Sequence, residues 1–187
     1  MSAPKDSEVL QWIEGCRKGN RRAQHKLFRH FYPAMYRLCM RYASSTDEAD
    51  DMLNEGFLKV FSNLEKYKED TGSFESWMKR VMVHAAIDYR RKYDPKVDMA
   101  DLADWSESGA IGYDVNVAVG KMSADELVAL IQKLPPMTRT VFNLFVFENC
   151  SHAEIAQQMG ITEGTSAWHV NAARTRLKNE IEKWNEL

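Results

Sequence analysis

The sequence contains no long apolar run. The longest candidate, around residues 141–147, is interrupted by Asn143, whereas a membrane-spanning helix needs about 20 apolar residues. The first ten residues include Lys5, Asp6 and Glu8 and have no apolar stretch ending in small residues, so they do not resemble a secretory signal. We therefore expect a cytoplasmic protein without a membrane span.

Cysteine is also scarce. The three cysteines, Cys16, Cys39 and Cys150, are odd in number and widely spaced, and none belongs to a CxxC pair. This pattern excludes a disulfide framework and gives no sign of a zinc site. We interpret the three as reduced and mostly buried side chains.

The motifs of common enzyme classes are missing too. The chain has neither a glycine loop that would cradle a phosphate nor a GxSxG nucleophile turn. His152 and Glu154 match the HxE fragment of zinc deaminases, but no PCxxC follows, so we interpret His152 as a surface residue near a helix N-terminus. His25 and His30 have no carboxylate at metal-ligand spacing. We expect no catalytic residue, no metal and no cofactor.

The composition is that of a soluble globular protein. The 187 residues are 44% hydrophobic and 28% charged, which predicts one large domain or two small ones. The net charge of −2 conceals blocks of opposite sign. Residues 20–46 hold six bases and no acid, residues 47–55 hold five acids and no base, and residues 71–93 hold five bases and two acids. Such alternation indicates several charged partners.

Apolar residues in the first half recur with helical spacing, and strand alternation is absent. Pro33 should kink or divide the first helix, because proline lacks the backbone N–H and crowds the preceding turn. Ser45 and Glu48 form a capping-box pattern at the start of the second helix. Three helices are therefore predicted here, over residues 28–42, 47–64 and 74–92.

The pattern ends after residue 93. Residues 94–121 hold six acids, two bases and scattered glycines, and we interpret them as an acidic flexible linker. Beyond them, capping boxes begin at Ser123 and Ser151, and Pro135 and Pro136 separate two helices. Four further helices are predicted, over residues 123–134, 137–148, 151–159 and 163–184. The predicted fold is all-α, with two small helical domains over residues 23–93 and 122–187 and a tail or the start of a first helix in residues 1–22.

The segment from Ser151 onward has the layout of a helix-turn-helix. A short helix ends at Gly160, which can take the positive φ that the turn requires, and Thr162 caps the second helix. The expected buried stripe of that helix is Val170, Ala173, Leu177, Ile181 and Trp184. The expected outward face, where a major groove would be read, is Gly164, Ala167, Trp168, Asn171 and Arg174. The alternative is an ordinary helical hairpin with an exposed tryptophan.

Two further clusters are candidates for binding. Arg80, His84 and Arg91 share a face of the third helix beside Trp77, and single-stranded nucleic acid selects such a combination of cations and aromatics. The alternative is a solvated basic helix over a core that contains Trp77. The acids of residues 47–51 could suggest a metal site, but their place in a first helical turn favours solvated surface or protein contact.

Two long segments together carry a resemblance to a known family. The first reads STDEADDMLNEGFLKVFSNLEKY and is followed by GSFESWMKRVMVHAAIDYRRK. The second reads LPPMTRTVFNLFVFENCSHAEIAQQMGITEGTSAWHVNAARTRL. They are similar, in order and separation, to regions 2 and 4 of bacterial RNA polymerase sigma factors of the extracytoplasmic-function class, in the sigma-70 family. The resemblance covers roughly residues 23–93 and 122–184.

This resemblance implies a promoter-specificity subunit without catalytic activity. Its partners would be core RNA polymerase, through the β′ coiled coil and the β flap, and promoter DNA. An anti-sigma factor, soluble or membrane-anchored, is also implied, and insertion of the chain itself into a membrane is not. The linker would pass through basic channels of the polymerase.

The resemblance also assigns site residues. The loop of residues 66–73 would hold a displaced base of the −10 element. The helix residues that would bind or melt the −10 element are Trp77, Lys79, Arg80, His84, Arg90, Arg91 and Lys92. The residues that would read the −35 element are Thr165, Ala167, Trp168, Asn171 and Arg174. The polymerase-docking residues would be Asp47, Asp50, Asp51, Asn54, Glu55 and Leu58.

The sequence departs from the family pattern at several of these positions. The family often has a base where Val83, Ala167 and Ala172 stand, asparagine at His84, and a branched aliphatic residue at Ser166. Fewer cations therefore remain for DNA, and the bulky Trp168 suggests a different promoter preference. Two alternatives of other classes are a helix-turn-helix regulator that binds duplex DNA alone and a helical protein that binds polymerase or an anti-sigma factor without contacting DNA.

Overall fold

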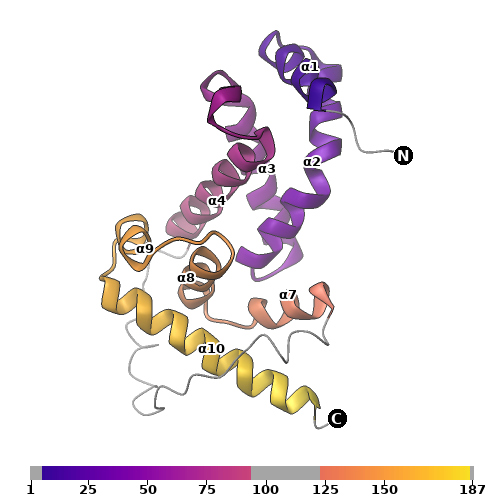
Figure 1. Ribbon diagram of the computed structural model, residues 1–187. Coiled ribbons are helices and arrows are strands. Elements are labelled where there is room, and N and C mark those ends of the chain that lie inside the picture. Colours follow the sequence, from indigo (N-terminus) through magenta and orange to yellow (C-terminus); the bar gives the residue numbers. More distant parts are fainter. Residues whose placement is uncertain (1–5, 94–122, 186–187) are drawn as a thin grey trace. The chain divides into compact units, whose positions relative to one another are not determined.

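The computed structural model describes residues 6–93 and 123–185, and these residues form helices and turns without a strand (Figure 1). The chain divides into two compact units between Tyr89 and Arg90. The prediction of an all-α fold with two helical domains is confirmed. The predicted linker, residues 94–121, lies outside the described residues, and the domain boundaries stay predictions.

The first unit begins with α1 (Asp6–Arg17), which lies within the segment predicted as a tail or the start of a helix. α1 packs on α2, and α2 packs on α3. The predicted second and third helices are confirmed as α3 and α4. The remaining elements of this unit are α2 (Arg21–Tyr42), α3 (Thr46–Ser62), η1 (Leu64–Lys66), η2 (Glu69–Thr71) and α4 (Phe74–Tyr93), whose last four residues lie beyond the division at Tyr89.

Pro33 was predicted to kink or divide a helix, and the division is wrong, because α2 runs through it from Arg21 to Tyr42. Pro33 lies on the exposed side of α2, where its missing N–H has least effect on the fold. The opposite side is buried, with Leu27 and Met35 at 0% exposure. Tertiary packing of that apolar side therefore outweighs the local cost of the proline.

The start of α3 differs in one detail from the predicted capping box. The Ser45 hydroxyl accepts from the Glu48 backbone N–H at 3.2 Å, as expected. The Glu48 carboxylate, however, accepts from the backbone N–H of Ser44 and not from that of Ser45. The helix N-terminus is capped all the same, because both bonds satisfy backbone donors that precede the first full turn.

The second unit contains the four predicted helices, α7 (Ala124–Gln132), α8 (Pro136–Val146), α9 (His152–Met159) and α10 (Glu163–Asn185). The capping boxes at Ser123 and Ser151 are both complete. Hydrogen bonds to the capping serines lower the pKa of Glu126 and of Glu154 below the ordinary value. Apolar residues from α7, α8, α10 and the turn between α7 and α8 form a core, comprising Leu130, Ile131, Leu134, Phe142, Ala173, Leu177 and Ile181.

Cys16 and Cys39 are buried, Cys150 is half-buried, and all three are free thiols. Burial raises the pKa of Cys16 to about 11 and that of Cys39 to about 12, so both stay protonated at neutral pH. Within residues 6–93 and 123–185, no group of three acidic, histidine or cysteine side chains could hold a metal ion. In the same residues no helix is both long and apolar enough to cross a bilayer.

Candidate nucleic-acid and protein interfaces

The turn between α9 and α10 is built as the sequence predicts. Gly160 has φ 69° and ψ 33°, a left-handed conformation that costs glycine little, and its N–H donates to Ala156 at 2.9 Å. The Thr162 hydroxyl then accepts from the Thr165 backbone N–H at 3.1 Å and caps α10. The glycine that ends α9 and the threonine that caps α10 thus define the turn of a helix-turn-helix.

The second helix of this motif, α10, presents an outward face at its N-terminal half. Gly164, Asn171 and Arg174 are exposed, and Ala167 and Trp168 are half-buried. Thr165 is half-buried, and its hydroxyl lies 2.9 Å from that of Thr162. The predicted buried stripe is confirmed at Val170, Ala173, Leu177 and Ile181, while the side chain of Trp184 is outside the described part.

Two histidines join α10 to the helices beneath it. His152 is half-buried, and its Nδ1 lies 3.0 Å from the hydroxyl of Ser166, which is 0% exposed. His169 is buried, and its Nδ1 lies 3.0 Å from the Thr138 hydroxyl. The interpretation of His152 as a plain surface residue is therefore wrong, because the imidazole connects α9 to α10. The serine found where the family favours an aliphatic residue makes this connection possible.

Phe145 of α8 contacts residues of both helices of the helix-turn-helix. The His152 ring stacks on it, with centroids 4.6 Å apart and planes at 14°. The guanidinium carbon of Arg174 lies 5.7 Å from the centroid of the same ring, a cation–π contact. Arg174, predicted as a DNA contact, is thus held by an aromatic residue from another helix.

In the first unit, the predicted −10 residues of α4 separate into exposed and buried positions. Lys79, Arg80, His84, Arg91 and Lys92 are exposed, so the basic face exists. Arg90, in contrast, is only 9% exposed and does not lie open beside its neighbours. Lys79 forms an ion pair with Glu75 at 2.7 Å, and the carboxylate offsets the positive charge of this lysine. Val83, at a position where the family often has a base, is buried.

Trp77 packs against the core and stays partly exposed, and its predicted role in base stacking stays a prediction. Its ring packs on the core side against Tyr67, at 5.7 Å between centroids, and against Phe74, at 5.5 Å. Tyr67 and Phe74 are buried, whereas Trp77 is half-buried and keeps part of its surface open.

The acidic face of α3 has the composition of a protein contact. Asp47, Asp50, Asp51 and Asn54 are exposed, and Leu58 is 67% exposed among them. Glu55, the remaining predicted docking residue, is half-buried, and the Tyr89 hydroxyl of α4 donates to Asp51 at 3.3 Å. An apolar side chain among carboxylates suits a protein partner with basic and apolar groups.

Two tyrosines of α2 lie near the acidic face of α3, and the sequence analysis did not identify them as part of a candidate surface. The rings of Tyr32 and Tyr36 stack with centroids 5.6 Å apart and planes at 6°. Burial raises the pKa of the Tyr36 phenol, and the nearby Asp50 carboxylate adds to the rise. The only sequence signal was the i, i+4 spacing of the two rings, which a core stripe would share.

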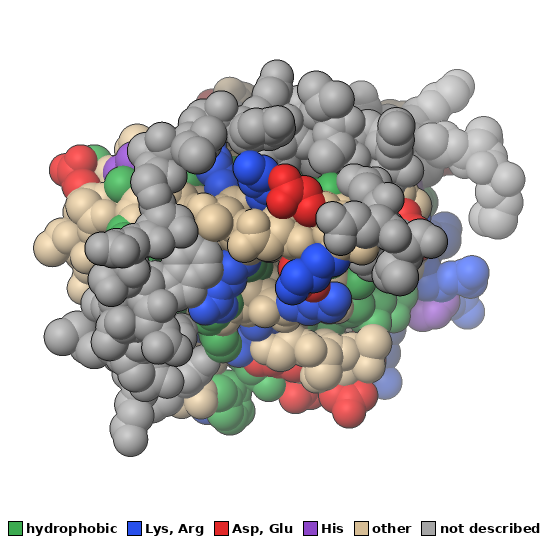
Figure 2. Space-filling view, turned by 90° about the horizontal axis from the view of Figure 1, so that it is seen from below, with side chains coloured by type: hydrophobic (Ala, Val, Ile, Leu, Met, Phe, Trp, Pro, Cys, Tyr) green, Lys and Arg blue, Asp and Glu red, His purple; other side chains and the backbone are tan. Residues whose placement is uncertain are grey.

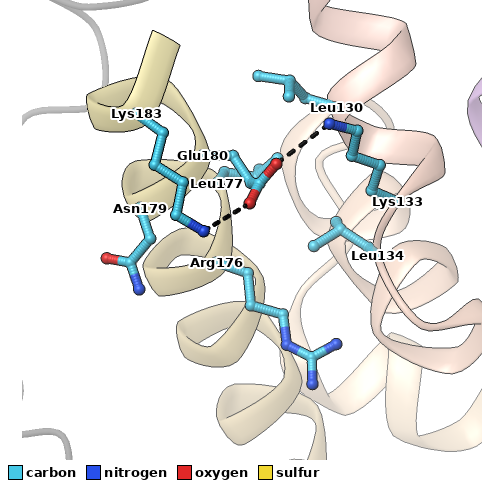
Figure 3. A pocket seen from close by; sticks show the side chains of 8 residues that line it. All are labelled: Leu130, Lys133, Leu134, Arg176, Leu177, Asn179, Glu180 and Lys183. Atoms are coloured by element: carbon cyan, nitrogen blue, oxygen red, sulfur yellow. Dashed lines mark hydrogen bonds and ion pairs between the residues drawn. The ribbon is translucent and has the colours of Figure 1, made fainter. Parts of the chain in front are cut away.

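A groove between α7 and the C-terminal part of α10 is the second feature that sequence reasoning missed (Figure 3). It has a volume of about 310 Å³, and Leu130, Leu134 and Leu177 form part of its lining. Glu180 accepts from Lys133 at 3.1 Å and from Lys183 at 3.2 Å, as the dashed lines in Figure 3 show. These bonds lower the pKa of Glu180, and the bond with Lys133 has the largest effect. On the face in Figure 2, basic and acidic side chains are likewise interspersed.

Comparison with known families matches both units. Residues 27–95 match the model of Sigma-70 region 2, and residues 124–177 match that of Sigma-70, region 4. The first match ends just after α4, and the second contains α7, α8, α9 and the outward face of α10. The three exposed faces described above, on α3, α4 and α10, therefore fall within matched regions.

Two curated relatives match nearly the whole chain. The ECF RNA polymerase sigma factor SigW of Bacillus subtilis is 27% identical over 183 residues, which span 92% of this chain and 96% of the relative. The RNA polymerase sigma-H factor of Pseudomonas aeruginosa is 27% identical over 181 residues, which span 92% of this chain and 93% of the relative. The similarity thus extends over both units in the same order.

Two solved structures are similar over most of their length. One is the sigma factor RpoE in complex with the anti-sigma factor NepR from Bartonella quintana, at 20% identity and a TM-score of 0.49, covering 85% of this chain and 96% of that chain. The other is CnrH in complex with the cytosolic domain of CnrY, at 17% identity and a TM-score of 0.46, covering 92% and 96%.

Proposed function

The chain belongs to the sigma-70 family of RNA polymerase sigma factors, in the extracytoplasmic-function class, and from this premise we propose that it directs transcription initiation as a promoter-specificity subunit. In this role it binds core RNA polymerase and recognises the −10 and −35 promoter elements. The observation that carries the proposal is the presence of both family regions in one chain, each with an exposed face of suitable chemistry. The proposal assigns it no catalytic step and places it in the cytoplasm, where the polymerase acts.

The outward face of α10 reads the −35 element in the major groove. Trp168 and Asn171 lie about one turn apart near the N-terminal end of the helix, which is the part of a recognition helix that reaches base edges. Arg174 lies nearly one turn further on and binds a phosphate, so it positions the helix without reading sequence. Thr165 and Ala167 lie on the same part of α10, and their small side chains allow the helix to come close to the major groove.

The exposed cations of α4 and the open part of Trp77 act on the −10 element. Arg80, His84 and Arg91 lie on one face, where they can follow a phosphate backbone, and the tryptophan offers a ring for an unpaired base. Lys79 and Lys92 add positive charge beside them. Arg90 contributes through the packing of α4, since its side chain is nearly buried.

The acidic face of α3 docks on the polymerase. The carboxylates of Asp47, Asp50 and Asp51 face a basic partner, and Leu58 contributes apolar area at the centre of the contact. In the family this helix binds the β′ coiled coil, and region 4 binds the β flap. We extend both contacts, promoter DNA and an anti-sigma factor to this chain as partners.

Transcription reconstituted from purified components tests the proposal. The protein is added to sigma-free core polymerase with a library of randomised promoter fragments, and transcript start sites are sequenced. We expect starts that share a −10 and a −35 sequence and that require both components. Binding to duplex DNA without polymerase would instead favour a stand-alone regulator, and polymerase binding without initiation would favour an interaction protein.

A further inference from the structure

The connection between α3 and α4 is held in place from a distant part of the chain. It comprises the two short turns η1 and η2 and ends at the exposed Ser73. In Figure 1 this connection and α1 lie at the same end of the first unit, and α1 contacts η1. The N-terminal helix has no role in the proposed function so far.

Arg17, the last residue of α1, makes the link. Its Nη2 donates to the carbonyl of Leu64 at 3.1 Å and to that of Tyr67 at 2.7 Å. These carbonyls belong to η1 and to the residue that follows it, 47 and 50 positions further along the chain. Hydrogen bonds from a charged donor are about twice as strong as neutral ones.

Two carboxylates orient the guanidinium for this task. Glu14, one turn earlier on α1, accepts from Nη1, and a Glu65 carboxylate oxygen lies 3.9 Å from Nε. The Arg17 side chain is 23% exposed, so water competes only partly for its donors. α1 itself is anchored by Ile13 and Cys16, at 1% and 6% exposure. The guanidinium is therefore a fixed point and not a mobile surface cation.

The bond from Arg17 holds the backbone of Tyr67, from which its ring extends. The ring packs edge-on against Phe74, at 5.0 Å between centroids, and supports Trp77 at 5.7 Å. Its hydroxyl donates to the carbonyl of Gly72 at 3.3 Å, across the loop. Gly72 has φ 125°, a conformation that other residues rarely adopt. Arg17 thus holds one end of the loop, and the Tyr67 hydroxyl holds the other.

We propose that Arg17 is a positioning residue for −10 recognition, which holds the α3–α4 loop and the Tyr67–Trp77 rings in a shape ready to accept an unpaired base. The inference rests on the proposed function, because the base is the ligand that function supplies. Preorganisation matters here because a loop that must be ordered on binding loses part of its stacking energy to conformational entropy. Arg17 itself need not touch DNA.

The test compares Arg17→Met, which keeps an apolar stem but no donors, with Lys18→Met. Lys18 is the adjacent exposed cation, so the control loses the same charge at the same end of α1. Each variant is assembled with core polymerase, and its affinity is measured for a forked promoter with an unpaired −10 strand and for a duplex carrying only the −35 element. Hydrogen exchange of residues 63–73 is measured in the free proteins.

We expect Arg17→Met to exchange faster in the loop and to bind the forked promoter at least about fivefold more weakly, the equivalent of ~1 kcal/mol of stacking. Core binding and −35 affinity should stay within twofold of wild type, and Lys18→Met should match wild type throughout. If Arg17→Met does not fold, Arg17→Lys replaces it, because a compact ammonium retains charge without the planar fork.

Three results would overturn the inference. Forked-promoter affinity equal to that of Lys18→Met would mean that the loop does not depend on Arg17. An equal loss of core, −35 and forked binding would indicate a general role in stability. If wild-type holoenzyme does not bind the forked promoter more tightly than the −35 duplex, the proposed function itself is wrong, and faster loop exchange in Arg17→Met would then report a structural anchor only.

Discussion

Replacing Arg174 by alanine should weaken binding to every −35 sequence alike. The side chain is exposed on α10 and lies over the Phe145 ring, and we propose that it contacts a phosphate and not a base edge. Each neutralised phosphate contributes about 0.9 to the slope of log affinity against log salt concentration. Loss of one contact should therefore lower the slope by about one unit.

This slope gives a magnitude that can be measured. Between 50 and 200 mM salt, one phosphate contact accounts for a ~3.5-fold change in affinity, which the Arg174→Ala holoenzyme should no longer show. Asn171→Ala should behave differently and alter the preference at one base position by roughly 1 to 3 kcal/mol. The two side chains thus separate anchoring from sequence reading.

The assay measures holoenzyme affinity for a panel of single-base −35 variants at several salt concentrations. Lys183→Ala is a suitable control, because this cation lies further along α10 and pairs with Glu180. If Asn171→Ala keeps the ranking of sequences and Arg174→Ala rearranges it, the two roles are reversed. If neither variant changes affinity, α10 does not read DNA.

Three further predictions concern the other surfaces. Reversing Asp50 and Asp51 together to lysine should weaken core polymerase binding by charge repulsion, and an unchanged pull-down would contradict docking through α3. Folded Arg80→Ala and Arg91→Ala variants should open the −10 region less, as measured by permanganate reactivity, and normal melting would remove α4 from this role. Ser166→Ala should lower the free energy of unfolding by ~1 to 3 kcal/mol in urea titrations, because it removes a buried hydrogen bond; equal stability would show that the bond is dispensable.

Features with a local physical cause were predictable from the sequence. The complete capping boxes at Ser123 and Ser151 and the left-handed Gly160 depend on residues within a few positions of one another. The exposed faces of α3 and α10 followed from helical periodicity, because the buried apolar residues of each helix recur at helical spacing on the opposite side. Such local patterns determine where a helix begins, where it ends and which of its faces is exposed.

Features that depend on distant contacts were not predictable. The continuity of α2 through Pro33 depends on the packing of its opposite side, which local propensity does not contain. The bonds of Arg17 to η1 join residues 47 and 50 positions apart, and no spacing rule indicates them. The role of Ser166 became visible only when the structure placed it opposite His152. The sequence marked Pro33 and Ser166 as unusual without showing what each does, and it gave no sign of the role of Arg17.

The aromatic ring beneath Arg174 has a consequence for the exchange of promoter specificity between relatives. A chimera that receives only the outward side chains of α10 would acquire the arginine without the Phe145 ring that supports it. The same ring stacks on His152, so replacing it would also disturb the α9–α10 junction. The transferable cassette is therefore α8, α9 and α10 together, and grafts of the recognition helix alone should read their new target less faithfully than the donor does.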